Sequence, residues 1–72
     1  MEANKIRQMS TEEIQAEVDD TREELMRLRF QRATGELVDH NQIRLARRKI
    51  ARMLTILNER RAEEEASLEG EA

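Results

Sequence analysis

The stretch RLARRKIARMLTIL, residues 44–57, carries two patterns at once. Its apolar residues, together with the residue just before it, recur at spacings of three and four, which predicts one buried face of a helix. These residues are Ile43, Ala46, Ile50, Met53 and Leu57. Arg44, Arg48 and Arg52 form a second row, at spacings of four, that points largely away from the first. The stretch therefore predicts an amphipathic helix with one apolar face and one basic face.

The N-terminal half predicts another helix of the same kind. Ser10 and Glu13 fit a capping box with Ser10 as the N-cap, and Met9 and Ile14 occupy the positions of a hydrophobic staple. Its apolar face consists of Ile14, Val18, Thr21, Leu25 and Leu28. Gly35 is placed to end this helix as a C′ glycine.

The two predicted helices span about residues 11–33 and 40–62, and Asp39 would cap the second one. Because a short loop makes neighbouring helices antiparallel, the sequence predicts an all-α fold, a long antiparallel two-helix hairpin with a coiled-coil-like seam.

The chain ends add little to this hairpin. Ile6 would anchor a short N-terminal helical turn, so the hairpin unit covers residues 1–62. Residues 63–72 form a tail that is acidic and poor in apolar groups. We expect the second helix to fray in this tail and the tail to be disordered, at least beyond Ser67.

Composition excludes several classes of protein. A chain of 72 residues is near the size at which one core barely offsets chain entropy, and the absence of cysteine removes disulfides and thiolate zinc sites as stabilisers. A macromolecular partner is therefore expected. The apolar runs are far too short for a membrane span, and the N-terminus lacks the apolar stretch of a secretory signal. We expect a cytoplasmic protein without a membrane partner.

The net charge of −3 conceals a strong segregation of charge. Residues 22–61 hold eleven cations and five acids, for a net charge of +6. Residues 1–21 hold two cations and six acids, and residues 62–72 hold five acids and no cation. A basic middle between acidic ends suggests a polyanionic partner for the middle.

The basic face itself could be solvated, or could meet a nucleic-acid backbone, a protein or a membrane surface. Like charges at i, i+4 repel one another, so a face that served solubility alone would usually mix signs. Eleven of the thirteen cations are arginine, which binds phosphate in a bidentate manner. With Phe30 as the only aromatic residue, stacking on splayed bases is disfavoured, and contacts to phosphates and helix shape fit better.

Two large apolar residues, Met26 and Phe30, lie away from the seam of the first helix. They could cover the hairpin end or the N-terminal turn, or they could form a protein-docking patch. We find no catalytic constellation, because adjacent carboxylates diverge on a helix and His40 follows a cap without acids spaced for a metal. No enzyme, metal, cofactor or small-molecule substrate is expected.

Three segments closely resemble the bacterial large-subunit ribosomal protein twenty-nine family. They are KIRQMSTEEI (residues 5–14), LRFQRATGEL (residues 28–37) and RLARRKIARMLTIL (residues 44–57), and the likeness covers about residues 4–60. The resemblance implies a long helical hairpin on large-subunit ribosomal RNA near the nascent-chain exit. It also implies that the neighbour is large-subunit protein twenty-three, at a site where chaperones and targeting factors dock. The glycine turn of the family corresponds to residues 34–37 of this chain.

We therefore expect a non-enzymatic constituent of the large ribosomal subunit that binds ribosomal RNA through its basic helix face. The alternative is a coiled-coil adaptor that binds an acidic protein partner. The predicted RNA-binding residues are Arg29, Arg32, Arg44, Arg47, Arg48, Lys49, Arg52 and Thr55. The acidic tail is assigned away from RNA, because carboxylates and phosphates repel one another.

Overall fold

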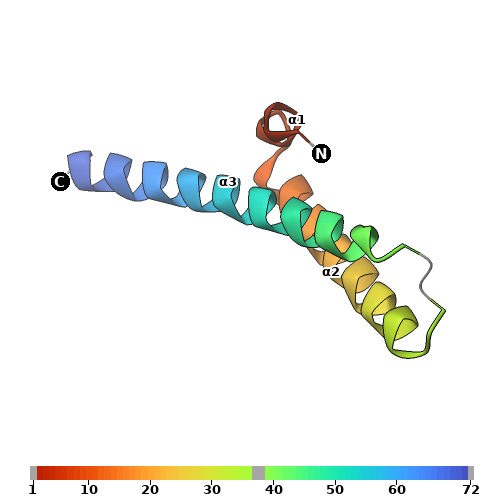
Figure 1. Cartoon of the computed structure of the whole chain (residues 1–72). Helices are drawn as coiled ribbons and strands as arrows, with labels where there is room; N and C mark the ends of the chain where they lie inside the picture. Colours follow the sequence, from red (N-terminus) through yellow and green to blue (C-terminus); the bar gives the residue numbers. More distant parts are fainter. Residues whose placement is uncertain (1, 37–38, 72) are drawn as a thin grey trace.

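The computed structural model describes residues 2–36 and 39–71, with side-chain surroundings as far as residue 68. It contains three helices, α1 (Ala3–Arg7), α2 (Thr11–Ala33) and α3 (Asn41–Glu71), and the described residues include no strand. Helix α2 lies against the first part of α3, α1 crosses near the start of α2, and the rest of α3 projects beyond both (Figure 1). The molecule is elongated, measuring 56 × 20 × 16 Å. The predicted all-α hairpin is confirmed.

The predicted start of α2 is confirmed in detail. The Ser10 hydroxyl accepts a hydrogen bond from the backbone N–H of Glu13 at 3.1 Å, which satisfies one of the free amides of the first turn. Met9 is partly buried and packs against the apolar cluster that contains Ile14, as a hydrophobic staple requires.

The turn after α2 is a Schellman motif. The N–H of Glu36 donates to the carbonyl of Gln31 at 2.8 Å, and the N–H of Gly35 donates to the carbonyl of Arg32 at 3.2 Å. Gly35 has φ +79°, a left-handed conformation that glycine adopts without steric cost. The predicted C′ glycine is thus confirmed, while Leu37 of the turn lies outside the described residues.

Helix α3 begins one residue later than predicted. The N–H of Asn41 donates to Oδ1 of Asp39 at 2.9 Å, so the expected capping side chain is in use. The helix itself begins at Asn41 rather than at His40, a shift within the ordinary uncertainty of a helix end.

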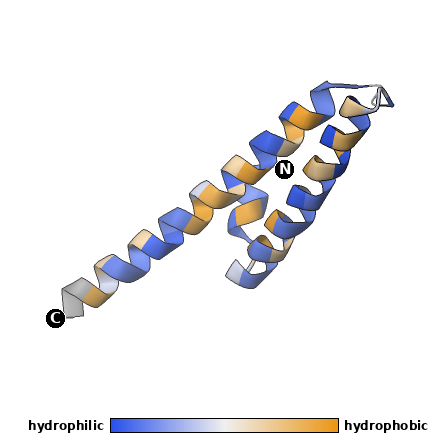
Figure 2. Ribbon diagram, turned by 90° about the horizontal axis from the view of Figure 1, so that it is seen from below, coloured by the Kyte–Doolittle hydropathy of each residue, from blue (hydrophilic) through white to orange (hydrophobic). Residues whose placement is uncertain are grey.

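The seam between α2 and α3 contains two apolar clusters. Residues late in α2 meet residues early in α3, and residues early in α2 meet the middle of α3, so the helices are antiparallel. The loop-end cluster consists of Leu25, Leu28, Ile43 and Ala46, with Ile50 partly buried against it. The α1-end cluster consists of Ile6, Ile14, Val18, Met53 and Ile56. Hydrophobic residues gather where the three helices meet (Figure 2).

The predicted seam omits one core residue. Ile56 is only 3% exposed and belongs to the core, whereas the predicted Leu57 is partly buried at its edge. The reason is α1. Ile6, the predicted anchor of the N-terminal turn, is fully buried in the same cluster as Ile56 and supplies a third wall that a two-helix pattern does not contain.

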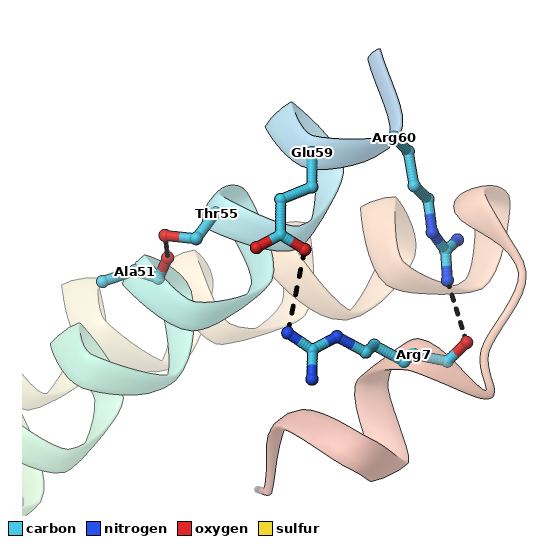
Figure 3. Close-up of polar contacts among 5 residues, drawn as sticks. All are labelled: Arg7, Ala51, Thr55, Glu59 and Arg60. Atoms are coloured by element: carbon cyan, nitrogen blue, oxygen red, sulfur yellow. Dashed lines mark hydrogen bonds and ion pairs between the residues drawn. The ribbon is translucent and has the colours of Figure 1, made fainter. Parts of the chain in front are cut away.

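Arg60 attaches this third wall to the hairpin. Its guanidinium donates to the carbonyl oxygens of Arg7 and Met9, at 3.1 and 2.8 Å, and to the hydroxyl of Thr11 at 3.1 Å. Arg7 in turn forms an ion pair with Glu59 at 3.8 Å (Figure 3). One arginine of α3 therefore joins the end of α1 and the start of α2.

The predicted disorder of the acidic tail, residues 63–72, is wrong as far as Glu71, because α3 continues to that residue. Alanine, glutamate and leucine dominate the segment, and all three are strong helix formers. Arg60 and Arg61 also precede Glu64 and Glu65 by four residues, a spacing that favours helix. Within the described part of the chain, none of the helices combines the length and apolar content needed to cross a bilayer.

Candidate nucleic-acid interface

The outward face of α3 carries four side chains that we call the arginine row. They are Arg44, Arg48, Arg52 and Thr55. All four are exposed, whereas the seam residues on the opposite side of the helix are buried or partly buried. At about 100° of turn per residue, the four positions fall within an arc of about 80°. The apolar pattern that directs α3 towards α2 thus leaves this row pointing away from the hairpin.

Cations predominate on this face of α3, although Glu24 of α2 lines the same groove as Arg48 and Arg52. The sequence contains no acid between residues 40 and 58, so the three arginines of the row have no acid within four positions on α3, while Glu59 lies four positions after Thr55. Successive arginines of the row begin from Cα atoms about 6 Å apart along the helix axis. One stretch of phosphate backbone lying along α3 could therefore meet all three guanidinium groups.

Thr55 contributes differently from the arginines. Its hydroxyl donates to the carbonyl of Ala51 at 2.8 Å (Figure 3), so its single proton is used within the helix. A phosphate offers only acceptors. In this conformation Thr55 lines a groove together with Arg52 but has no hydroxyl proton left to donate to a phosphate.

Lys49, also predicted to bind RNA, lies in the hairpin instead of the arginine row. Its Nζ is 2.6 Å from a carboxylate oxygen of Glu17, and the two side chains are 26% and 32% exposed. The pair connects α3 to α2 across the seam. Because both groups are partly solvated, its contribution to stability is at most about 1 kcal/mol. The sequence pattern gave no signal for it, because the two residues are 32 positions apart.

The remaining predicted residues occupy other surfaces. Arg29 lines a shallow groove with Arg22, Leu25, Met26 and Ile50. Arg48 and Arg52 line a different groove, together with Thr21, Glu24 and Leu45 among others. Arg32 is exposed in the last turn of α2, and Arg47 is exposed on the flank of α3. The structure therefore brings three of the predicted arginines together as a row and distributes the others along the hairpin.

Leu45 is a residue of this surface that the sequence pattern did not single out. It is 54% exposed and lines the groove that contains Arg48 and Arg52. An apolar residue that breaks the three-four spacing of the seam is the signal that could have found it.

Met26 and Phe30 are 71% and 67% exposed. This exposure contradicts the alternative in which they cover the hairpin end or the N-terminal turn, and α1 packs through Ile6 against the cluster at the other end of the seam. Arg22 and Arg29 flank the two side chains on α2, and Arg29 lies beside Met26 in the same groove. The hairpin thus presents an exposed apolar pair bordered by cations.

Comparisons with known proteins agree on one family. The family model described as Ribosomal L29 protein matches residues 4–60. The large ribosomal subunit protein uL29 of Rubrobacter xylanophilus is 46% identical over 63 residues, which cover 88% of this chain and 94% of that protein. The uL29 proteins of Staphylococcus haemolyticus and Staphylococcus aureus are 45% and 44% identical over 64 residues, 89% of this chain and 93% of theirs.

Proposed function

Since the chain belongs to the ribosomal protein L29 family, and is therefore a non-enzymatic structural constituent of the large ribosomal subunit, we propose that it binds ribosomal RNA through the arginine row. Such a protein works in the cytoplasm, on the ribosome. Membership of this family favours the ribosomal function over the alternative of a coiled-coil adaptor.

The observation that carries this proposal is the separation of the two faces of α3. Arg44, Arg48 and Arg52 are exposed on one side, while the opposite side is buried against α2 and α1. RNA can therefore approach the row without disturbing the core. Arginine is suited to this contact because its planar guanidinium matches phosphate geometry. The contact is to the backbone and to helix shape, since the chain offers no aromatic platform along the row.

The exposed pair Met26 and Phe30 supports a second contact, with protein. Two large apolar side chains exposed together in so polar a chain are typical of a docking surface. We assign this pair to the neighbouring large-subunit protein twenty-three at the tunnel exit, where chaperones and targeting factors would also approach. The test is a density map of the assembled subunit, in which protein density should cover Met26 and Phe30. RNA density over both side chains would contradict the assignment.

The RNA contact is tested by salt dependence. Binding that neutralises phosphates releases counterions, so the logarithm of affinity falls linearly with the logarithm of salt concentration. Replacing Arg44, Arg48 and Arg52 by Gln keeps helix propensity and should reduce that slope by up to about three units, or less on compact RNA. The matched control replaces Glu63, Glu64 and Glu65 by Gln and should leave the slope nearly unchanged. If the arginine variant binds ribosomal RNA with the parental slope, the row is only a solvated face.

A further inference from the structure

The groove between α2 and α3, beside the arginine row, contains more than phosphate binding requires. It has a volume of about 450 Å³, which lies within the range of small-ligand sites, about 300–1,000 Å³. Leu45 and Ala46 contribute apolar surface to it, and Leu45 is 54% exposed. Leu45 belongs to neither of the two apolar clusters of the seam, and its side chain cannot bind a phosphate. The groove therefore joins an exposed apolar surface to two arginines of the row.

A carboxylate also lines this groove. Glu24 reaches it from α2 and is exposed, and its carboxylate has no ion-pair or hydrogen-bond partner among the described residues. Lys49 lines the same groove, but its Nζ is 2.6 Å from the carboxylate of Glu17, so its charge is already matched. A phosphate that entered the groove would be repelled by Glu24. The groove suits a ligand with a flat, weakly polar face and N–H donors at its edge, and a nucleobase has both.

We propose that this groove receives the base of one unpaired guanosine of ribosomal RNA, whose phosphate is held by Arg48. This contact rests on the proposed binding of ribosomal RNA and adds one base to the backbone contacts. Leu45 and Arg48 are three positions apart, so they are neighbours on the surface of α3. A nucleotide with its phosphate at the row therefore has its base beside the groove. The base covers Leu45, and the carboxylate of Glu24 accepts hydrogen bonds from its N1–H and N2–H groups.

The pattern of donors selects guanine among the four bases. An ionised carboxylate only accepts hydrogen bonds, and it has two oxygens to satisfy. Guanine offers two donors from adjacent atoms, N1–H and N2–H, which meet both oxygens of Glu24. Adenine and cytosine place a ring nitrogen acceptor beside their single amino group, and uracil places a carbonyl on each side of its one N–H. Each of these three bases would turn a lone pair towards the carboxylate, which disfavours it.

A charge-matched pair of variants tests the contact. Glu24→Gln and Glu23→Gln each remove one negative charge from an exposed position of α2, and Glu23 does not line the groove. If RNA met only the arginines, both changes would leave the affinity for ribosomal RNA unchanged or raise it. We expect Glu24→Gln to lower the affinity by about fivefold, because an amide cannot accept both hydrogen bonds from guanine. Glu23→Gln should not lower it. The salt slope should stay parental in both variants, since no phosphate contact is lost.

Chemical probing identifies the base. Kethoxal, a dicarbonyl, reacts with N1 and N2 of unpaired guanine. At saturating protein, at least one guanine should be protected by the parental chain and by Glu23→Gln but reactive with Glu24→Gln. The absence of such a guanine, or an affinity of Glu24→Gln no lower than that of Glu23→Gln, would overturn the guanine contact. If the triple arginine variant shows a reduced salt slope while this contact is overturned, the proposed RNA binding stands. If that variant keeps the parental slope, the RNA binding itself fails.

Discussion

The two ends of the hairpin seam are built from similar residues but are closed to different extents. At the α1 end, the five cluster residues are 0–3% exposed, and a third helix covers them. At the loop end, the four cluster residues are 6–8% exposed, and Met26 and Phe30 stand exposed on the outer side of α2. A seam between two helices is always open along its flanks, so a third element decides which stretch becomes a closed core.

Polar contacts reinforce the same difference. Arg60 donates to three acceptors at the α1 end, and two of them are backbone carbonyls, one on the last residue of α1 and one two residues after it. At the loop end, the polar contacts of the described residues are local to the turn, such as the Schellman hydrogen bonds after α2 and the Asp39 cap before α3. We therefore expect the α1 end to carry most of the stability, while the loop end leaves Met26 and Phe30 exposed.

The largest expected effect is in the closed core. Met53 is fully buried, so Met53→Ala should lower the free energy of unfolding by about 2–5 kcal/mol, enough to abolish cooperative folding of so small a chain. Leu28→Ala, at the open end, should lower the free energy of unfolding by less, near about 2 kcal/mol, because water and neighbouring side chains can fill the site. Urea unfolding followed by circular dichroism measures both. If the two variants lose equal free energy of unfolding, the two ends of the seam are equally well packed and the proposed difference between them is contradicted.

A smaller effect is expected for the arginine that fastens α1. Arg60→Gln removes hydrogen bonds from a charged donor to three acceptors and should cost about 1–3 kcal/mol. Arg44→Gln, an exposed change on the same helix, is the control and should alter stability by no more than about 0.5 kcal/mol. Hydrogen exchange should show faster opening of α1 in the first variant only. Unchanged protection of α1 would mean that Ile6 alone holds it.

The sequence was most informative where structure depends on near neighbours. The Ser10 cap, the Gly35 turn and the three-four spacing of the seam are local signals, and each was predicted correctly. The burial of Ile56 depends on α1, and the pairing of Lys49 with Glu17 depends on how two helices are aligned. Neither can be derived from periodicity along one helix, because both are set by tertiary packing.

In the candidate site, too, the features set by one helix could be predicted from the sequence, and the features set by tertiary packing could not. Arg44, Arg48 and Arg52 could be placed on one outward face because a helix fixes their relative directions. The spread of Arg29 and Arg32 over other surfaces became visible only with the hairpin. In the acidic tail, low apolar content predicts disorder, but the helix propensity of the residues prevails and the helix continues.

A density map of the assembled large subunit would show directly whether the outward face of α3 lies on ribosomal RNA. We expect phosphate groups within hydrogen-bonding distance of Arg44, Arg48 and Arg52 along this face. A map in which these three arginines face solvent, with RNA absent from the outward side of α3, would contradict this expectation.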